Sequence, residues 1–192
     1  MFNGIIYNQA VIKNIKKFKK SFYIEVVSNI KFSKKDTGRS ISCNGVCLTI
    51  SNVIGKSIFF YLSPETMNVT NFNYIKIGDF INIERSIKYG DDISGHFVQG
   101  HVDTTGIVKK VSIISKTWFV DIQISKKYIN FLTKKGSVSI NGVSLTVSKI
   151  NRYGFQITII PHTLKLTNLK MLSKNKIINI EFDMIGKYLK KI

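Results

Sequence analysis

One segment of this chain occurs twice, and this repeat limits the possible folds more than any other feature. Residues 40–50 read SISCNGVCLTI, and residues 137–147, which lie 97 positions later, read SVSINGVSLTV. Seven of the eleven paired positions are identical. The same offset aligns the INIE of residues 81–84 with the INIE of residues 178–181. The chain therefore consists of one unit that is written twice.

Each unit is long enough to form a domain of its own. Repeats of about 20 to 50 residues must stack to bury a core, whereas a unit of about 95 residues is close to the usual domain size. We expect a boundary near residues 93–96. It divides the chain into an N-terminal domain, residues 1–96, and a C-terminal domain, residues 97–192.

Short β-rich segments follow one another in both units. They are rich in Ile, Val, Phe and Tyr and are flanked by Asn, Gly, Ser or Asp, as at residues 22–27, 57–62, 80–84, 118–124, 154–160 and 177–182. The only prolines are Pro64 and Pro161, and we expect a short helix after each. The pattern predicts an all-β fold of two tandem, homologous, six-stranded antiparallel β-barrels.

An Asn-Gly dipeptide lies between β-rich flanks in each unit, at residues 44–45 and 141–142. This pair favours a two-residue hairpin turn because both turn positions require a positive φ angle. Such a turn puts Cys47 and Ser144 at matching points of the two hairpins, each opposite a serine. Both could act as nucleophiles. A small buried hydrophobic residue is the alternative interpretation of Cys47.

The chain is strongly basic, with 29 Lys and Arg against 11 Asp and Glu and a net charge of +18. Only three of the basic residues are arginine, which makes the bidentate base contacts of specific nucleic-acid recognition. We interpret the lysines as solvated surface and expect no nucleic-acid partner. A nucleic-acid-binding barrel is the rival hypothesis, and it requires exposed aromatic side chains along a basic groove.

No stretch approaches the roughly 18 to 20 apolar residues of a membrane-spanning helix, and no charged leader precedes an apolar segment at the start. We therefore expect a cytoplasmic protein without membrane contact. Cys43 and Cys47 are too few for a disulfide framework. In one extended segment they would lie about 13 Å apart, too far for a disulfide, which needs about 7 Å. We also expect no metal site, since no other cysteine could complete one.

Five motifs together resemble the α-type riboflavin synthase family. They are MFNGII at residues 1–6, NGVCLT at 44–49, SGHFVQGHVD at 94–103, NGVSLT at 141–146 and EFDMIGKY at 181–188. The resemblance thus covers nearly the whole chain.

The resemblance implies a transferase that works without a cofactor or metal. Two molecules of 6,7-dimethyl-8-ribityllumazine react, and a four-carbon unit passes from one to the other to give riboflavin and 5-amino-6-ribitylamino-uracil. Two similar pockets that hold the substrates face to face would supply much of the rate, which explains the duplication. The resemblance also implies a homotrimer, in which the N-terminal barrel of one subunit faces the C-terminal barrel of the next.

Residue by residue, the resemblance implies catalytic roles for Cys47, Ser144, Asp183 and His101, with a weaker role for His96. As a hypothesis, Asp183 keeps Ser144 or a water molecule basic enough to remove a proton or to deliver the nucleophile. Cys47 would add to, or steady, the electrophilic carbon of the other lumazine. The histidines would move protons near neutral pH.

The resemblance also implies the binding residues. The first pocket is expected to contain Ser40, Cys47, Leu48, Thr49, Tyr61, Leu62, Ser63, Pro64, Glu65 and Thr66. The second is expected to contain Gly100, His101, Val102, Lys135, Ser144, Leu145, Thr146, Thr158, Ile159, Ile160, Pro161, His162 and Thr163. Backbone groups of Gly4, Ile5 and Ile6 would reach the ring in the opposite half. Solvated surface is the alternative for Lys135 and His162, and a plain strand serine for Ser40.

Two departures from the family pattern stand out. Asn3 occupies a position where Thr is usual. Family members also continue after the Gly-Lys-Tyr of residues 186–188 with a helix of about twenty residues that bundles the trimer. Here we expect that C-terminal helix to be truncated or absent. A lumazine- or flavin-binding protein without turnover on the same scaffold is the second rival hypothesis.

Overall fold

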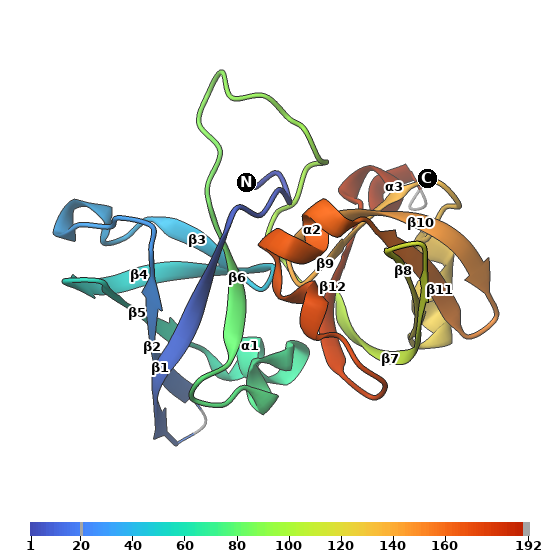
Figure 1. Ribbon diagram of the computed structural model, residues 1–192. Coiled ribbons are helices and arrows are strands. Elements are labelled where there is room, and N and C mark those ends of the chain that lie inside the picture. The colour runs from blue at the N-terminus through green and yellow to red at the C-terminus, as the bar shows by residue number, and fades with distance from the viewer. Residues whose placement is uncertain (20, 190–192) are drawn as a thin grey trace.

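The chain folds into two closed, six-stranded antiparallel β-barrels that lie side by side, as the sequence predicted (Figure 1). A computed structural model describes residues 1–19 and 21–189. The first barrel contains β1 (Asn8–Phe18), β2 (Ser21–Ser28), β3 (Ser40–Cys43), β4 (Val46–Ile54), β5 (Ser57–Leu62) and β6 (Phe80–Arg85). The second contains β7 (Thr104–Ile114), β8 (Thr117–Gln123), β9 (Ser137–Ile140), β10 (Val143–Asn151), β11 (Gly154–Ile159) and β12 (Ile177–Phe182).

The two barrels share one strand order. The first closes as β1-β2-β5-β4-β3-β6, and the second, followed around its ring from β7, closes as β7-β8-β11-β10-β9-β12. Each strand thus has the same neighbours as its counterpart in the other repeat. The segment between β6 and β7 contains the expected domain boundary near residues 93–96, which remains a prediction.

Short helices begin at the two prolines, as predicted: α1 (Pro64–Val69) and α2 (Pro161–Leu166). Proline suits the first helical position because a backbone N–H there would have no partner within the helix, so its absence costs nothing. Short 3-10 helices complete the connections: η1 (Lys34–Asp36), η2 (Asn71–Tyr74), η3 (Lys126–Phe131) and η4 (Asn168–Met171). The last described element is a helix, α3 (Met184–Leu189). The expectation of a truncated or absent C-terminal helix concerns residues outside the described ones and stays a prediction.

The β-strand alternation explains how each barrel buries its core and still presents polar side chains outside. In β4, Val46, Leu48 and Ile50 are at most 5% exposed and belong to the first core, whereas Cys47 between them is only partly buried and Thr49 is exposed. Successive side chains of a strand point to opposite faces. Cys47 therefore points out of its barrel.

Both hairpin turns have the predicted conformation. Asn44 and Gly45 have φ angles of 48° and 77°, and Asn141 and Gly142 have φ angles of 46° and 80°. The two turns also meet between the barrels, where a Cβ on Gly45 would lie 2.6 Å from the backbone nitrogen of Gly142. Only glycine allows so close an approach of two backbones.

Buried asparagines join the barrels around these turns. The Asn82 amide nitrogen donates to the backbone oxygen of Asn141 at 2.9 Å, and that of Asn179 donates to the backbone oxygen of Asn44, also at 2.9 Å. All four side chains are at most 5% exposed. Buried backbone carbonyls need such partners, and here each barrel supplies them to the other.

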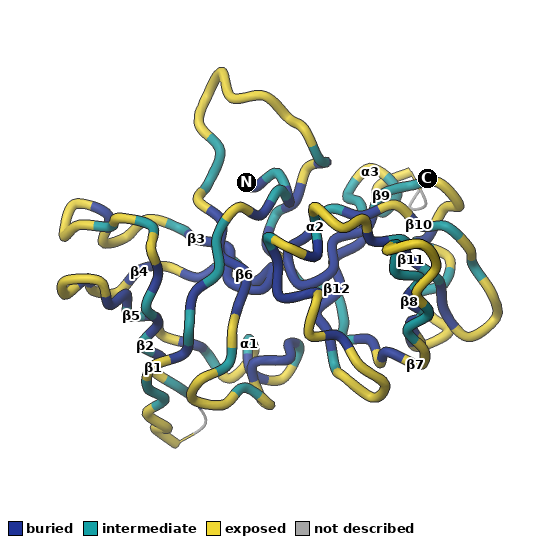
Figure 2. The backbone as a smooth tube through the Cα atoms, viewed as in Figure 1, coloured by how far each residue is buried: buried dark blue, intermediate teal, exposed yellow. Residues whose placement is uncertain are grey.

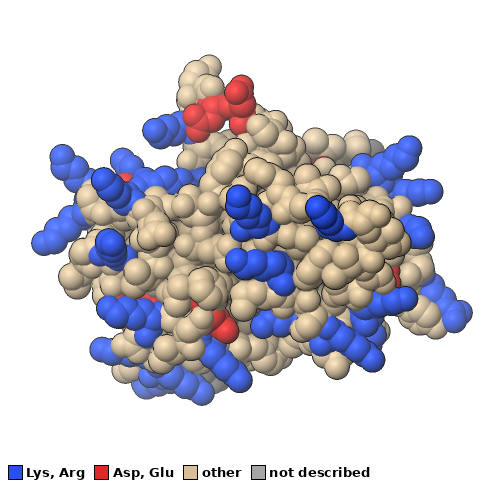
Figure 3. Space-filling view, in the orientation of Figure 1, with Lys and Arg blue, Asp and Glu red and all other residues tan. Residues whose placement is uncertain are grey.

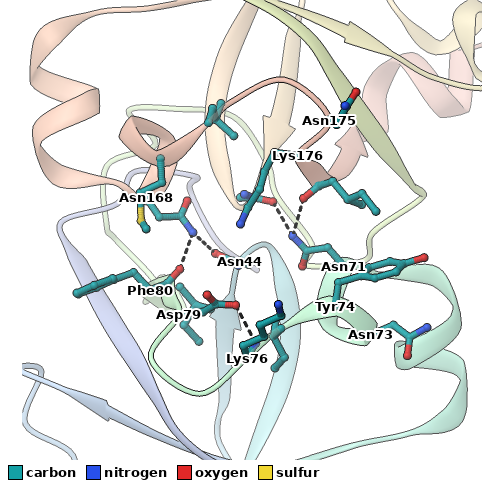
Figure 4. Close-up of a pocket in the computed structure, with 16 residues that line it drawn as sticks. Asn44, Asn71, Asn73, Tyr74, Lys76, Asp79, Phe80, Asn168, Asn175 and Lys176 are labelled. Carbon is teal, nitrogen blue, oxygen red and sulfur yellow. Dashed lines mark hydrogen bonds between the residues drawn. The ribbon is translucent and has the colours of Figure 1, made fainter.

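A third asparagine from each repeat extends the network and borders a cavity of about 620 Å³ between the barrels (Figure 4). The backbone N–H of Asn71 donates to the Asn179 side chain at 2.6 Å, and that of Asn168 donates to the Asn82 side chain at 2.8 Å. None of the residues that line this cavity belongs to the predicted site.

The surface carries most of the charge. Buried residues gather where the barrels meet, whereas the loops are exposed (Figure 2). Lysine and arginine side chains are spread over the face shown in Figure 3 and do not form one continuous stripe there. Among the described residues, no helix has both the length and the apolar character needed to cross a membrane.

Candidate functional site

The candidate site is built on the two Asn-Gly hairpins. Ser42 pairs with Cys47 across β3 and β4, and Ser139 pairs with Ser144 across β9 and β10, as predicted. Like Cys47, Ser144 is partly buried between two core residues of its strand, so both side chains point out of their barrels. The side chains of Cys47 and Ser144 thus occupy equivalent positions in the two repeats.

Two segments outside the barrels run across these hairpins. We call residues 2–4 the N-terminal strap and residues 98–101 the middle strap. The straps pair with each other, since the backbone N–H of Phe2 donates to Val98 O at 2.7 Å and that of Val98 donates to Phe2 O at 3.1 Å. Both side chains are fully buried, which holds the straps against the molecule.

Each strap touches the reactive residue of the opposite repeat. The backbone N–H of Ser144 donates to Gly4 O at 2.8 Å, which places the N-terminal strap against the second barrel. The backbone N–H of Cys47 donates to Gly100 O at 2.7 Å. The assignment of Gly100 and Val102 to the second pocket stays a prediction, but Gly100 lies on Cys47 and Val102 packs against the core of the first barrel.

Both contacts require glycine. Gly4 and Gly100 have φ angles of 72° and 79°, a region that strains residues with a side chain. A Cβ on Gly4 would lie 2.8 Å from the Ser144 Cβ, and one on Gly100 would lie 2.7 Å from the Cys47 Cβ. The straps therefore fit directly against the two reactive side chains.

A histidine contacts Ser144. The Ser144 Oγ and His96 Nδ1 atoms are 2.6 Å apart, and His96 is 8% exposed. Burial lowers the pKa of His96, while the negative charge of Asp183 acts in the opposite direction. The net lowering favours the neutral imidazole, which can accept a proton from the serine hydroxyl. Ser144 and His96 thus form a hydrogen-bonded pair.

Two other predicted catalytic residues, Asp183 and His101, do not contact the Ser144 side chain through a hydrogen bond, and their roles stay predictions. Asp183 was expected to pair with Ser144. In the structure its Oδ1 accepts the backbone N–H of Ile185 at 3.0 Å, and its negative charge acts to raise the pKa of His96. His101 was favoured over His96, yet the His101 residue is exposed and contributes its backbone N–H to Glu181. His96 is the histidine that reaches the predicted nucleophile.

The first repeat lacks such a pair. Among the described residues, no hydrogen bond reaches the thiol of Cys47, which is only partly buried. Cys43 differs, because complete burial raises the pKa of its thiol strongly and keeps it protonated. A buried, protonated thiol is unreactive. Cys43 is therefore a buried structural residue, whereas Cys47 is only partly buried and its role stays a prediction.

The remaining predicted residues divide by burial. Side chains of Leu48, Leu62, Leu145 and Ile159 fill the barrel cores, so only their backbones could face a ligand. Many others are exposed or half-buried on the outer barrel surface: Thr49, Tyr61, Ser63, Pro64, Glu65, Thr66, Lys135, Thr146, Thr158, Ile160, Pro161, His162 and Thr163. Both candidate sites thus lie open on the surface.

Two buried glutamates were missed. Glu84 Oε1 accepts the backbone N–H groups of Asn3 at 2.8 Å and Gly4 at 3.1 Å. Glu181 accepts from the backbone of the middle strap at 2.7, 2.9 and 3.1 Å. Burial raises the pKa of each carboxyl to about 7, although the N–H donors oppose the shift. The repeated INIE motif was the signal, because it keeps a charged residue at the end of a buried strand in both repeats.

Comparisons with known proteins agree with this arrangement. A family profile described as the lumazine binding domain matches residues 3–86 and again residues 99–183. Riboflavin synthase of Bacillus amyloliquefaciens is 33% identical over 189 residues, which cover 98% of this chain and 88% of that protein. Riboflavin synthase of Escherichia coli (strain K12) is 35% identical over 190 residues, covering 95% of this chain and 87% of that protein.

Solved structures share the fold. The structure of LumP complexed with riboflavin has a TM-score of 0.83 at 25% identity and covers 95% of this chain and 99% of that one. LumP complexed with 6,7-dimethyl-8-(1'-D-ribityl) lumazine has a TM-score of 0.83 at 24% identity, covering 94% of this chain and 98% of that one. The chain belongs to the riboflavin synthase family of transferases and contains the lumazine-binding domain twice.

Proposed function

We propose that this protein converts two molecules of 6,7-dimethyl-8-ribityllumazine into riboflavin and 5-amino-6-ribitylamino-uracil. One lumazine donates a four-carbon unit, and the other accepts it. The observation that carries the proposal is the pair of equivalent positions occupied by unequal groups, Cys47 in one repeat and the Ser144–His96 pair in the other. Two identical substrates can take different roles only where their surroundings differ.

The residues suggest how the roles divide. His96 removes a proton from Ser144 or, through it, from a water molecule or the acidic 7-methyl group of one lumazine. Asp183 supports the positive charge that develops on His96. Cys47 acts on the electrophilic carbon of the other lumazine as a nucleophile or a polarisable contact. Holding both rings in contact supplies much of the rate.

A homotrimer in the cytoplasm is part of the same proposal. Both candidate sites are open surfaces, with Thr49, Tyr61, Thr146 and Ile160 exposed beside the two reactive residues. A site that brings two lumazines face to face needs a second surface to cover each of them. The N-terminal barrel of one subunit against the C-terminal barrel of the next supplies it.

Riboflavin fluorescence tests the proposal. Purified protein is mixed with 6,7-dimethyl-8-ribityllumazine, and the appearance of riboflavin is followed over a range of protein concentrations. We expect turnover, with a specific activity that rises with concentration as subunits associate. Analytical ultracentrifugation at the same concentrations gives the oligomeric state.

Two outcomes would refute it. Lumazine binding without riboflavin formation at any concentration would favour the binding protein over the enzyme. A specific activity that is constant while the protein sediments as a monomer would exclude a site shared between subunits. Asp183→Asn serves as the internal comparison, since it should keep the fold and reduce turnover sharply.

A further inference from the structure

We propose that Glu84 and Glu181 are positioning residues that act crosswise: the carboxylate of each repeat orients the reactive residue of the other repeat through a strap. This inference rests on the proposed function only for its effect on turnover. Its structural content concerns the straps, and it can be tested without any reaction.

Glu84 controls both sides of the Ser144–His96 pair. It holds the N-terminal strap through the backbone N–H groups of Asn3 and Gly4. Gly4 O then accepts the backbone N–H of Ser144 at 2.8 Å, and Asn3 O accepts that of His96 at 3.3 Å. The carboxylate thus lies in the first barrel, while both groups that it orients serve the second site.

Glu181 has the converse role. It holds the middle strap through the backbone N–H groups of Gln99, Gly100 and His101, and Gly100 O accepts the backbone N–H of Cys47 at 2.7 Å. This carboxylate belongs to the second barrel and orients the reactive residue of the first. Each strap is therefore fixed to one barrel by its N–H groups and to the other by a carbonyl.

The position of each glutamate in its sheet supports the assignment. Glu84 pairs with Ser42, which pairs with Cys47, so three adjacent strands carry these residues in one row. Glu181 pairs with Ser139, which pairs with Ser144, in an equivalent row. Both glutamates are at most 8% exposed, and a charged group is buried at such cost only with several partners. The straps supply those partners.

The two carboxylates differ in how a glutamine could replace them. Glu84 Oε1 receives both N–H groups of its strap, and Oε2 shares only that of Gly4, at 3.2 Å, so the single oxygen of glutamine can still accept both. Glu181 uses Oε1 for Gln99 and Oε2 for Gly100 and His101. A glutamine there would turn its NH₂ group toward a backbone N–H. We therefore expect Glu181→Gln to behave like Glu181→Ala, whereas Glu84→Gln is milder than Glu84→Ala.

Two probes that need no turnover test the crosswise connection. The first is the rate of Cys47 alkylation by iodoacetamide, since Cys43 is buried. Glu181→Gln should raise this rate several-fold by releasing the middle strap, and Glu84→Ala should leave it unchanged. The second is the NMR signal of the His96 ring, one of only three histidines. It should shift in Glu84→Ala and stay in place in Glu181→Gln.

Turnover supplies the third measurement. Glu181→Gln and Glu84→Ala should each lower kcat by about 10-fold to 100-fold, because small misplacements of reacting groups have effects of this size. Glu25→Gln and Asp121→Asn are matched controls: both are carboxylates on barrel strands that accept side-chain hydrogen bonds, at 2.6 and 2.8 Å, away from the straps. Their turnover, alkylation rate and His96 signal should equal those of the wild type.

The outcomes separate the two proposals. If the wild-type protein forms no riboflavin, the proposed function fails, while alkylation and NMR still decide on the straps. If Glu84→Ala and Glu181→Gln change both probes alike, or change neither, the crosswise assignment is overturned. Circular dichroism and a thermal melt of each variant show whether it is folded, and the milder Glu84→Gln provides a second variant of that residue.

Discussion

The two barrels of this protein have the same backbone framework and differ at the positions where chemistry is expected. Both have the same strand order, the same Asn-Gly turn and a buried glutamate that holds a strap. They differ at the reactive position, which is Cys47 without a hydrogen-bonded partner in the first repeat and Ser144 beside His96 in the second. The two repeats thus share a backbone framework and carry different side chains at equivalent positions.

The comparison also shows that the repeats are not independent. The N-terminal strap reaches Ser144 of the second barrel, and the middle strap reaches Cys47 of the first. The buried asparagines supply hydrogen bonds across the same boundary. Each half of the chain thus completes the other, although each barrel has a core of its own.

Removing the group that distinguishes the second repeat should have the largest effect. We expect Ser144→Ala or His96→Gln to lower kcat by about 10²-fold to 10⁴-fold, the usual contribution of a positioned acid or base. Steady-state measurement of riboflavin formation checks this, with circular dichroism as the control for folding. An unchanged kcat in His96→Gln would show that this histidine takes no part in the rate-limiting chemistry.

The shared glutamates should give both repeats the same pH dependence of stability. Their pKa values are raised from 4.5 to about 7 in the folded protein. A raised carboxyl pKa stabilises the fold fully below pH 4.5, and this contribution is lost as the pH rises through 7. The free energy of unfolding should therefore fall by about 3 kcal/mol per carboxyl across this interval, relative to a Glu84→Gln/Glu181→Gln variant.

Urea unfolding of the wild type and the double variant at several pH values measures this difference. The comparison with the double variant removes the contribution of other titrating groups, because both proteins contain them. One of these groups is His96, whose lowered pKa destabilises the fold as the pH falls. Parallel curves for the two proteins would contradict the raised pKa values.

Equivalent asparagines should contribute equally. Asn82→Ala and Asn179→Ala each remove a hydrogen bond of 2.9 Å to a buried backbone carbonyl of the opposite barrel. We expect each to lower the free energy of unfolding by about 1–3 kcal/mol, because an unsatisfied buried carbonyl remains. Thermal and urea unfolding measure both variants side by side. A large difference between the two losses of stability would show that these equivalent hydrogen bonds do not contribute equally to the interface.

Making the reactive positions alike should have the smallest effect. Cys47→Ser gives both repeats a serine and should lower kcat by about tenfold, since a hydroxyl is a weaker nucleophile than a thiol. Stability should change little, because Cys47 is only partly buried. Riboflavin formation and a thermal melt give the two numbers. A large loss of stability with unchanged kcat would return Cys47 to a structural role.

Much of this arrangement was predictable. The barrels, the short helices after Pro64 and Pro161 and the hairpin pairing of Cys47 with Ser42 follow from local patterns. The resemblance to a known family pointed to the reactive residues. His96 was undervalued because 48 positions separate it from Ser144, and no local pattern reveals a contact over that distance.

The sequence by itself determined that one β-rich unit is present twice. The repeat can be read directly from the sequence, and alternating side chains and Asn-Gly turns determine strands and hairpins through interactions over a few residues. Only the tertiary structure decided which half each strap serves. That assignment depends on backbone contacts between residues far apart in the sequence, such as Gly4 with Ser144 and Gly100 with Cys47. It also depends on glycines that let two backbones approach where a Cβ would collide.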